Sequence, residues 1–113
     1  LYILSAFLLL ATPAWAGQNI LTWQDNSTNE ANFNIERTTA TDVPACATAT
    51  GFTSLASVGF NVVTFTDTAV AEGTTYCYRV NASNTAGPSG FSNVAGRTVP
   101  FSIPLAPSGL IAN

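Results

Sequence analysis

The chain has 113 residues, enough for one domain and its flanking segments but not for two complete domains. Its charge is sparse, with three arginines, no lysine or histidine, six acidic residues and a formal net charge of −3. So few cations cannot neutralise a run of phosphates, which makes nucleic acid and anionic membrane surfaces poor partner candidates, and we expect no nucleic-acid partner. Thr, Ser and Asn must therefore supply most of the polar surface, and these residues favour strands and turns.

The first sixteen residues form an apolar segment typical of a targeting signal. Leu1 to Leu10 is an apolar run, and Ala14-Trp15-Ala16 gives the small-x-small pattern that precedes a cleavage site. We predict that residues 1-16 are a signal peptide, truncated because it lacks an initiating Met and a positive n-region, with the mature chain beginning at Gly17. A membrane anchor or a buried strand is the alternative, although a span needs roughly twenty apolar residues. We expect a secreted or cell-surface protein.

Export makes the two cysteines informative, because an oxidising compartment lets a pair of thiols form a structural bridge. Cys46 and Cys77 allow one intrachain pairing, and we predict that disulfide; two unpaired surface thiols are the alternative. Two thiols without a histidine are too few ligands for a metal site, and a nucleophilic cysteine would lack a base. We therefore expect no metal, no cofactor and no catalytic residue.

After the apolar segment, short strand-like runs alternate with turn clusters, which is the pattern of an all-β fold. The first run, residues 20–23, places Leu21 and Trp23 on one face of a strand. After a polar turn, Phe33 and Ile35 share a face of the next strand. Both runs therefore predict half-buried strands.

The middle of the chain is less regular. Residues 38–51 are too polar and too β-branched for a helix, and we predict an excursion loop that carries Cys46. Residues 52–58 favour an edge strand with imperfect alternation, and a further strand containing Phe65 ends at Asp67.

The strongest strand pattern follows Gly73. Tyr76, Tyr78 and Val80 face one way, whereas Cys77 shares the opposite face with Arg79 and Asn81. A turn then leads to a last predicted strand at residues 91–99, for six strands in all.

Several of these segments, taken in order, carry a resemblance to a known family. They are Leu21-Thr22-Trp23; Asp25-Asn26-Ser27 leading to Phe33-Asn34-Ile35-Glu36-Arg37; Phe65-Thr66-Asp67-Thr68; residues 76–84; and Gly87-Pro88-Ser89 with Ser92-Asn93. Together they resemble the fibronectin type III family, specifically the tandem repeats of exported bacterial proteins. The resemblance covers residues 20–99 and implies an all-β, immunoglobulin-like β-sandwich over residues 17-100.

The family pattern also implies roles for single residues. The expected structural core consists of inward-facing residues: Leu21, Trp23, Phe33, Ile35, Phe65, Tyr76, Tyr78 and Val80. Tyr76 stands where the family's tyrosine corner bonds back to the upstream chain. The family's strands C and F are neighbours, so the bridge between Cys46 and Cys77 should lie on the outer face of their sheet.

One departure concerns the family's first strand, strand A, for which there is no recognisable sequence before Asn19. A segment of that kind stands instead in residues 101-113, as Pro104 to Ala112, so we predict a linker followed by the first strand of a next repeat. The open edge beside the first strand could be covered by this tail in cis, by the tail of another copy, or by the N-terminal segment. Self-association through that edge is one expected consequence.

The sequence offers weak candidates for chemistry. Its carboxylates are Asp25, Glu30, Glu36, Asp42, Asp67 and Glu72. They fall mostly in turns and on outward strand positions, where solvation explains them better than catalysis, so we expect no enzyme. A calcium site among the turn acids and two N-glycosylation patterns, at Asn26 and Asn81, are alternatives without a strong motif. Phe60 and Phe91 could be exposed aromatics for stacking on a sugar or a protein.

We therefore expect a non-catalytic spacer, adhesion or interaction repeat of a larger exported protein. Its expected partners are other domains of the same longer chain and a protein or polysaccharide at the cell surface. The first alternative is an ancillary carbohydrate-binding or positioning module of a secreted polysaccharide-degrading enzyme. The second is a filament subunit assembled by strand donation.

Overall fold

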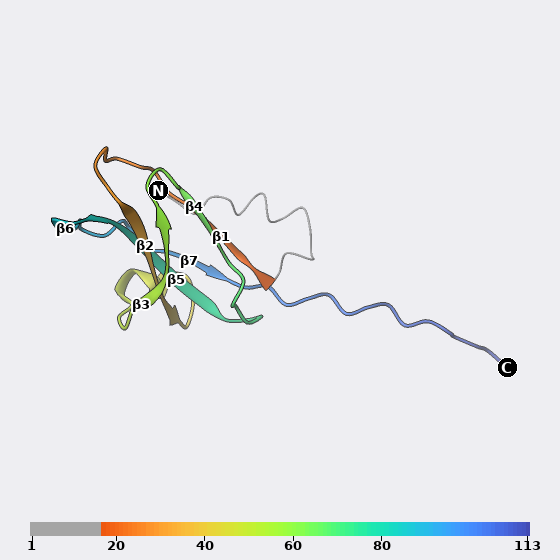
Figure 1. The fold of residues 1–113 in the computed structure, drawn as a ribbon. Coiled ribbons are helices and arrows are strands. Elements are labelled where there is room, and N and C mark those ends of the chain that lie inside the picture. Colours follow the sequence, from red (N-terminus) through yellow and green to blue (C-terminus); the bar gives the residue numbers. More distant parts are fainter. Residues whose placement is uncertain (1–16) are drawn as a thin grey trace.

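The computed structural model of the protein describes residues 17–113, so the predicted signal segment, residues 1-16, lies outside the described residues (Figure 1). Within the described range the regular structure is mainly β-strand, with the short 3-10 helix η2 (Pro44–Thr48) and no α-helix. No helix in that range has the length and apolar character needed to cross a membrane.

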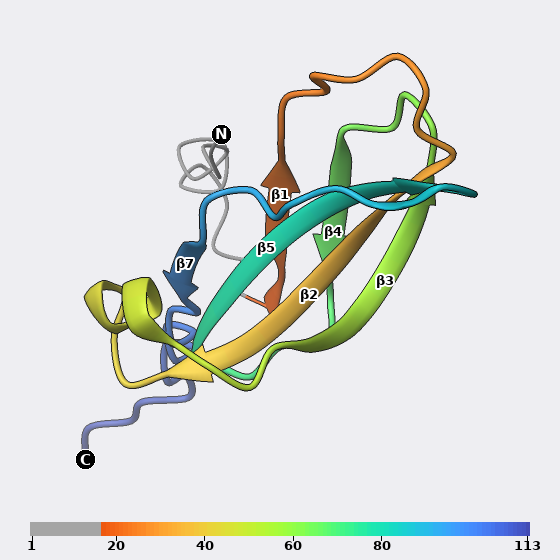
Figure 2. The same cartoon turned by 90° about the vertical axis from the view of Figure 1, so that its left-hand side faces the viewer.

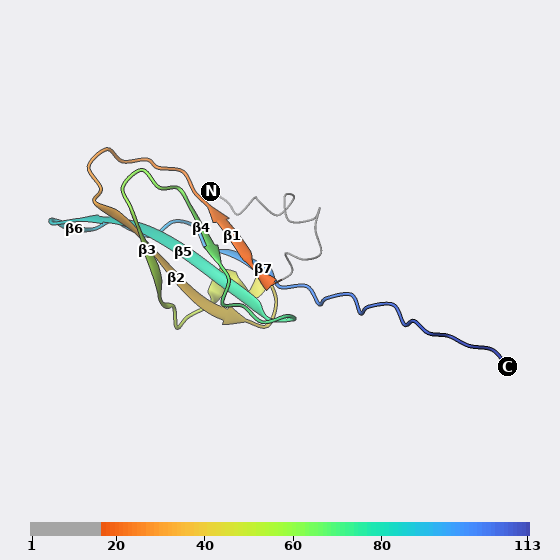
Figure 3. The same ribbon diagram turned by 45° about the vertical axis from the view of Figure 1, so that its right-hand side comes forward.

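Two antiparallel sheets form the sandwich. The smaller sheet pairs β1 (Asn19–Thr22) with β4 (Thr64–Asp67). The larger sheet has the order β3 (Thr53–Gly59), β2 (Asn32–Ala40), β5 (Thr75–Asn84) and β6 (Gly87–Pro88), with β7 (Ala95–Thr98) also paired to β5. Figure 2 looks onto the larger sheet, with β1 and β4 behind it, and Figure 3 shows the two layers more nearly edge-on.

The central ladder joins β2 to β5 from the pair Asn32–Ser83 to the pair Ala40–Thr75. Since side chains alternate between the two faces of a strand, this register carries Phe33, Ile35 and their β5 neighbours to the inner face. It carries the polar residues between them to the outer face. On these two strands Phe33, Ile35, Tyr76, Tyr78 and Val80 are buried.

The hydrophobic core lies between the sheets. Its buried cluster is Leu21, Phe33, Ile35, Tyr76, Tyr78, Val80 and Val99. Trp23 and Phe65, which the sequence places in the core, pack against this cluster and are only half-buried. Trp23 follows the last residue of β1, and its ring centroid lies 5.7 Å from that of Phe33. Phe65 is half-buried on the short strand β4.

The excursion loop predicted at residues 38–51 needs correction. Strand β2 continues to Ala40, and the loop contains a one-turn 3-10 helix, η2 (Pro44–Thr48). Pro44 suits the first turn of a helix because its fixed backbone angle is already helical and its missing N–H has no partner there. The Asp42 carboxylate accepts a hydrogen bond from the Ala45 N–H at 2.9 Å. Pro44 and the Asp42 carboxylate thus favour a short 3-10 helix in a segment whose composition argued against a long helix.

The last strand is also shorter than the predicted 91–99, because β7 covers only residues 95–98. Upstream of it, Ser89 and Ser92 each donate a backbone N–H to β5, at Ala82 O and Val80 O. Their side-chain hydroxyls accept the hydrogen bonds from Ala82 N and Val80 N, at 2.9 and 3.0 Å. Side-chain oxygens replace backbone carbonyls here, so the edge of β5 is satisfied without a regular strand.

Residues 101–113 are exposed and have no regular secondary structure, and the tail runs away from the sandwich in Figure 1. Its first residues are held by the loop before β5. Ser102 donates from both its N–H and its hydroxyl to the Glu72 carboxylate. The Phe101 ring lies over Gly73, where a Cβ would come within 2.4 Å of the ring. The tail therefore does not pair with β1 in cis, which was one of the arrangements expected for it.

Candidate binding surface

The outer face of the larger sheet carries an ordered set of amides and hydroxyls. Asn32 and Asn34 stand two residues apart on β2, and Asn81 and Ser83 two apart on β5, so all four point outward. The ladder sets Asn34 opposite Asn81 and Asn32 opposite Ser83, and Ser57 of β3 lies opposite Asn34. We call these five residues the polar array.

Hydrogen bonds join the polar array across three strands. The Asn32 amide nitrogen donates to Asn34 Oδ1 at 3.0 Å and to Ser57 Oγ at 2.8 Å. The Asn34 amide nitrogen donates to Asn81 Oδ1 at 2.9 Å and to Ser83 Oγ at 3.1 Å. The Ser83 hydroxyl donates to Asn32 Oδ1 at 2.7 Å, and the Ser57 hydroxyl donates to Asn34 Oδ1 at 3.3 Å. The side chains thus fix one another's orientation before any ligand arrives.

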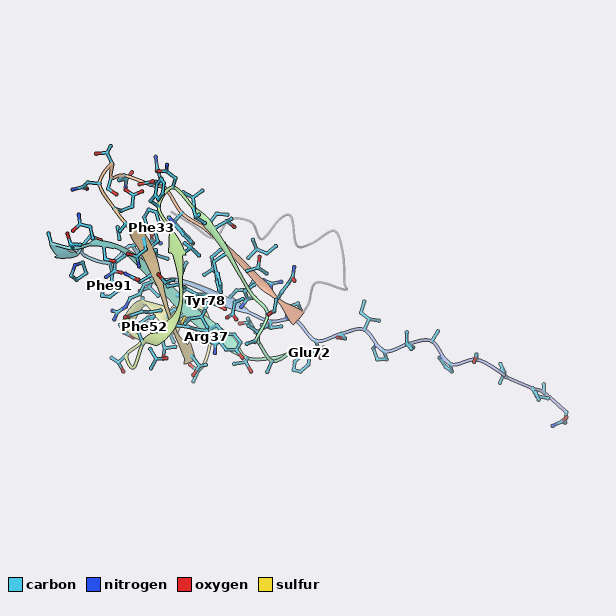
Figure 4. The ribbon with its side chains drawn as sticks, viewed as in Figure 1. Phe33, Arg37, Phe52, Glu72, Tyr78 and Phe91 are labelled. Carbon is cyan, nitrogen blue, oxygen red and sulfur yellow. A yellow bond between two sulfur atoms is a disulfide. The ribbon has the colours of Figure 1, made fainter. Side chains whose placement is uncertain are left out.

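Beside the polar array, an arginine lies between two aromatic rings. The guanidinium carbon of Arg79 is 4.3 Å from the ring centroid of Phe52 and 3.8 Å from that of Phe91 (both labelled in Figure 4). Glu36, opposite Arg79 in the ladder, accepts a hydrogen bond from Arg79 Nε at 2.8 Å and forms an ion pair with Nη2 at 2.7 Å. Cation–π contacts and the ion pair hold the guanidinium from three sides. We call Phe52, Arg79 and Phe91 the aromatic ridge.

The disulfide predicted between Cys46 and Cys77 is present, and it lies on this same face. Cys77 is on the outward side of β5 yet fully buried, because η2 folds over it and brings Cys46 into contact. The Cys46 sulfur also sits against Gly96 of β7, where a Cβ would come within 2.5 Å of it. The bridge therefore ties the loop between β2 and β3 to the sheet at the end opposite the polar array.

A hollow of about 370 Å³ opens at the edge of the sandwich. Its lining includes Trp23, Phe33 and Val80 from the core side, together with Asn81 and Phe91, which also belong to the polar array and the aromatic ridge. The Trp23 indole N–H is buried and has no hydrogen-bond partner in residues 17–113. The hollow is thus mainly apolar and continuous with the outer face.

Ionisable side chains are concentrated at the other end of the sandwich, between the two sheets. Asp67 is 2% exposed, which corrects the expectation that the carboxylates are solvated. Its carboxylate accepts hydrogen bonds from Arg37 at 2.8 Å, from the Tyr78 hydroxyl at 2.7 Å and from Ala69 N at 3.1 Å. Asn19 donates in turn to the Tyr78 hydroxyl at 2.8 Å. This network links β1, β2, β4 and β5 and explains why a charged group is buried.

The environment shifts the pKa values of this network. Burial raises the pKa of Tyr78 far above its ordinary value, because the phenolate would be cut off from water. Burial alone would lower the pKa of Arg37, but its hydrogen bond and attraction to Asp67 outweigh that effect and raise it. Burial lowers the pKa of Arg97, which donates to Asn19 Oδ1 at 2.7 Å. These shifts keep the Tyr78 hydroxyl neutral and the Arg37 guanidinium charged.

The other carboxylates make local contacts. Glu30 accepts a hydrogen bond from the Ser27 hydroxyl at 2.6 Å, which lowers its pKa, and Asp25 accepts from Ser27 N at 3.1 Å. Hydrogen bonds from Ser102 lower the pKa of Glu72. The part of the chain that the structure describes contains no group of three or more Cys, Asp or Glu side chains placed to hold a metal ion.

The remaining sequence candidates have separate places. Phe60 is 63% exposed at the turn after β3, and Phe91 is 44% exposed on the aromatic ridge. Asn81, one of the two predicted glycosylation positions, has its amide oxygen engaged in the polar array, and its amide nitrogen donates to Ser89 O at 3.5 Å. Tyr76 accepts a hydrogen bond from Ala71 N at 2.9 Å, five residues upstream, which is the tyrosine corner that the family resemblance implied.

No protein-family model and no curated protein matches the chain. Several solved structures have a similar fold. The sixth fibronectin type III domain of human fibronectin type III domain containing protein 3 is 19% identical, with a TM-score of 0.57 over 87% of this chain and 85% of that one. The fold is that of a fibronectin type III domain.

Two longer proteins contain a similar structure. The twitchin kinase region from C. elegans is 21% identical, with a TM-score of 0.60 over 75% of this chain and 14% of that one. Pectate lyase Pel3 from Pectobacterium carotovorum is 22% identical, with a TM-score of 0.59 over 81% of this chain and 26% of that one. The chain thus spans about a seventh and about a quarter of their lengths, and the likeness concerns the fibronectin type III fold alone.

Sequence reasoning missed the polar array and the aromatic ridge. The alternation did place Arg79 and Asn81 on the face opposite the core, but Phe52 belonged only to a predicted edge strand. A usable signal was the recurrence of Asn or Ser at every second position of two strands that the family pairs as neighbours. Nothing local indicated that Phe52 and Phe91, far apart in the chain, would meet at one arginine.

Proposed function

We propose that this fibronectin type III sandwich is a non-catalytic module that spaces or presents other domains of a longer exported protein. The observation that carries the proposal is the way the chain leaves the sandwich. The tail is anchored at Glu72 and Gly73 and then extends fully exposed, with Pro100, Pro104 and Pro107 restricting its backbone. A connector of this kind fixes the position at which the following segment leaves the sandwich.

Two further features support the proposal. Most of the described carboxylates and all three arginines of the chain make structural contacts within residues 17–113. The disulfide is typical of proteins that fold in oxidising compartments, as expected for an exported protein.

A module exchange tests the spacer function. In the natural full-length protein, residues 17–100 are replaced by an unrelated fibronectin type III domain of similar length. A spacer predicts that the activity or attachment of the whole protein survives the exchange. Loss of that function, with the hybrid folded and exported, would show that this surface does more than hold its neighbours apart.

A second candidate function is the positioning of an attached enzyme on a polysaccharide. Two observations favour it: the structural likeness to part of a pectate lyase, and an outer face built of amides, hydroxyls and aromatic rings. Retention of the isolated module on an insoluble polysaccharide would support it, and a freely eluting folded module would oppose it.

A further inference from the structure

We propose that the polar array and the aromatic ridge together form a docking face for a neutral glycan chain. The inference deepens the second candidate function and rests on it. It names the surface, Asn32, Asn34, Ser57, Asn81 and Ser83 with Phe91 at its edge, and the ligand chemistry, an uncharged polymer rich in hydroxyl groups.

The donor and acceptor balance of the polar array points to this ligand. An amide nitrogen has two N–H donors and a hydroxyl has one. Those of Asn32, Asn34, Ser57 and Ser83 are all directed at other members of the array. Asn32 Oδ1, Asn81 Oδ1 and the two hydroxyl oxygens each retain an unused lone pair. The face therefore offers acceptors, which the O–H groups of a sugar can satisfy. The Asn81 amide nitrogen, which donates one N–H to Ser89 O at 3.5 Å, adds its other N–H as a donor to a sugar oxygen.

The charge of the face excludes strongly charged ligands. Its cation, Arg79, is paired with Glu36 within the face, and both side chains are largely covered, at 30% and 25% exposed. The remaining arginines are engaged elsewhere, Arg37 with Asp67 and Arg97 with Asn19. A polyanion would meet a chain of net charge −3 with no free guanidinium, and a polycation would find no free carboxylate on this face.

Phe91 supplies an apolar contact next to these acceptors. Arg79 covers one side of its ring at 3.8 Å, and the side chain still keeps 44% of its surface exposed. A partly exposed aromatic ring can stack against the C–H side of a sugar ring, while neighbouring oxygens bind the hydroxyls. Asn81 and Phe91 also line the hollow of about 370 Å³, so the glycan path can continue over the edge of the sheet.

The face is rigid before binding, which lowers the entropic cost of association. The array lies on the three strands of the central ladders, and its side chains hold one another in place. Figure 2 shows these strands side by side, with the outer face toward the viewer.

The test is affinity electrophoresis of residues 17–113 in native gels. The gels contain either a neutral polysaccharide (xyloglucan, galactomannan, mixed-linkage β-glucan or hydroxyethyl cellulose) or the polyanion polygalacturonate, and mobility is compared with that in an empty gel. We expect retardation by at least one neutral polymer and none by polygalacturonate. Phe91→Ala and Asn34→Asp should each weaken binding about fivefold or more.

Matched controls separate the face from general effects. Phe60→Ala removes another exposed ring and Asn29→Asp adds the same charge in an exposed loop, so both should bind like the natural sequence. Thermal melts confirm that each variant is folded. If a neutral polymer retards the protein but both test variants bind normally, the docking face is wrong while the second candidate function stands. If no neutral polymer retards the folded protein, or polygalacturonate retards it equally, the glycan proposal is wrong.

Discussion

Removal of the disulfide should cost this small domain a large part of its stability. The bridge joins residues 31 positions apart, and closing a loop of that size in the unfolded chain corresponds to about 4 kcal/mol. Domains of this size have roughly 5 to 15 kcal/mol in total. The variant Cys46→Ala/Cys77→Ala should therefore keep its fold but melt about 15 to 30 °C lower.

The assay is guanidinium unfolding of residues 17–113, followed by the fluorescence of Trp23, the only tryptophan in that range. Natural protein treated with dithiothreitol should unfold at the midpoint of the double variant, whereas the variant itself should not respond to the reductant. The denaturant dependence should be steeper without the bridge, because the unfolded chain then exposes more surface.

The result that would refute this reasoning is equally specific. Free-thiol labelling of the unreduced, denatured protein should find neither cysteine, and labelling after reduction should find both. If reduction is complete by this criterion and the unfolding midpoint stays the same, the bridge does not stabilise the domain as proposed.

Three further predictions concern the sandwich itself. Asp67→Ala should lower the free energy of unfolding by about 3 kcal/mol, because it leaves a partly buried guanidinium without its partner; a loss near zero in urea denaturation would contradict this. Burial raises the pKa of Tyr78, so the stability that depends on its neutral form is complete below about pH 10 and is lost as the pH rises toward the folded-state pKa. Phenolate absorbance near 295 nm should show Tyr78 ionising only with unfolding, and titration at pH 10 in the folded state would refute this. Gly96→Ala places a methyl group 2.5 Å from the Cys46 sulfur and should cost about 1 to 3 kcal/mol, whereas Gly59→Ala, with nothing within 4 Å, should cost much less; similar melting points would count against the packing argument.

The sequence by itself determined the parts of the structure that depend on local alternation. Tyr76, Tyr78 and Val80 face the core and Cys77 faces outward because side chains in a strand alternate with a period of two. The pairing of the cysteines followed from there being only two of them. The all-β fold followed from the ordered set of short runs and turns, which a fibronectin type III sandwich shares.

The tertiary structure alone decided how distant residues meet. Asp67 looked like a solvated turn residue, and it is buried because Arg37, 30 residues away, and Tyr78 supply its hydrogen bonds. Ser89 and Ser92 replace a strand because their hydroxyls reach the edge of β5, a fit that depends on side-chain geometry.

The same reason applies to the candidate docking face. Alternation places Asn34 and Asn81 on outer faces, but their contact at 2.9 Å joins residues 47 positions apart and depends on the register of β2 against β5. A shift of that register by one residue would turn one of them inward. The contacts of Arg79 with Phe52 and Phe91 also depend on strand pairing, because the three residues lie in separate segments of the sequence.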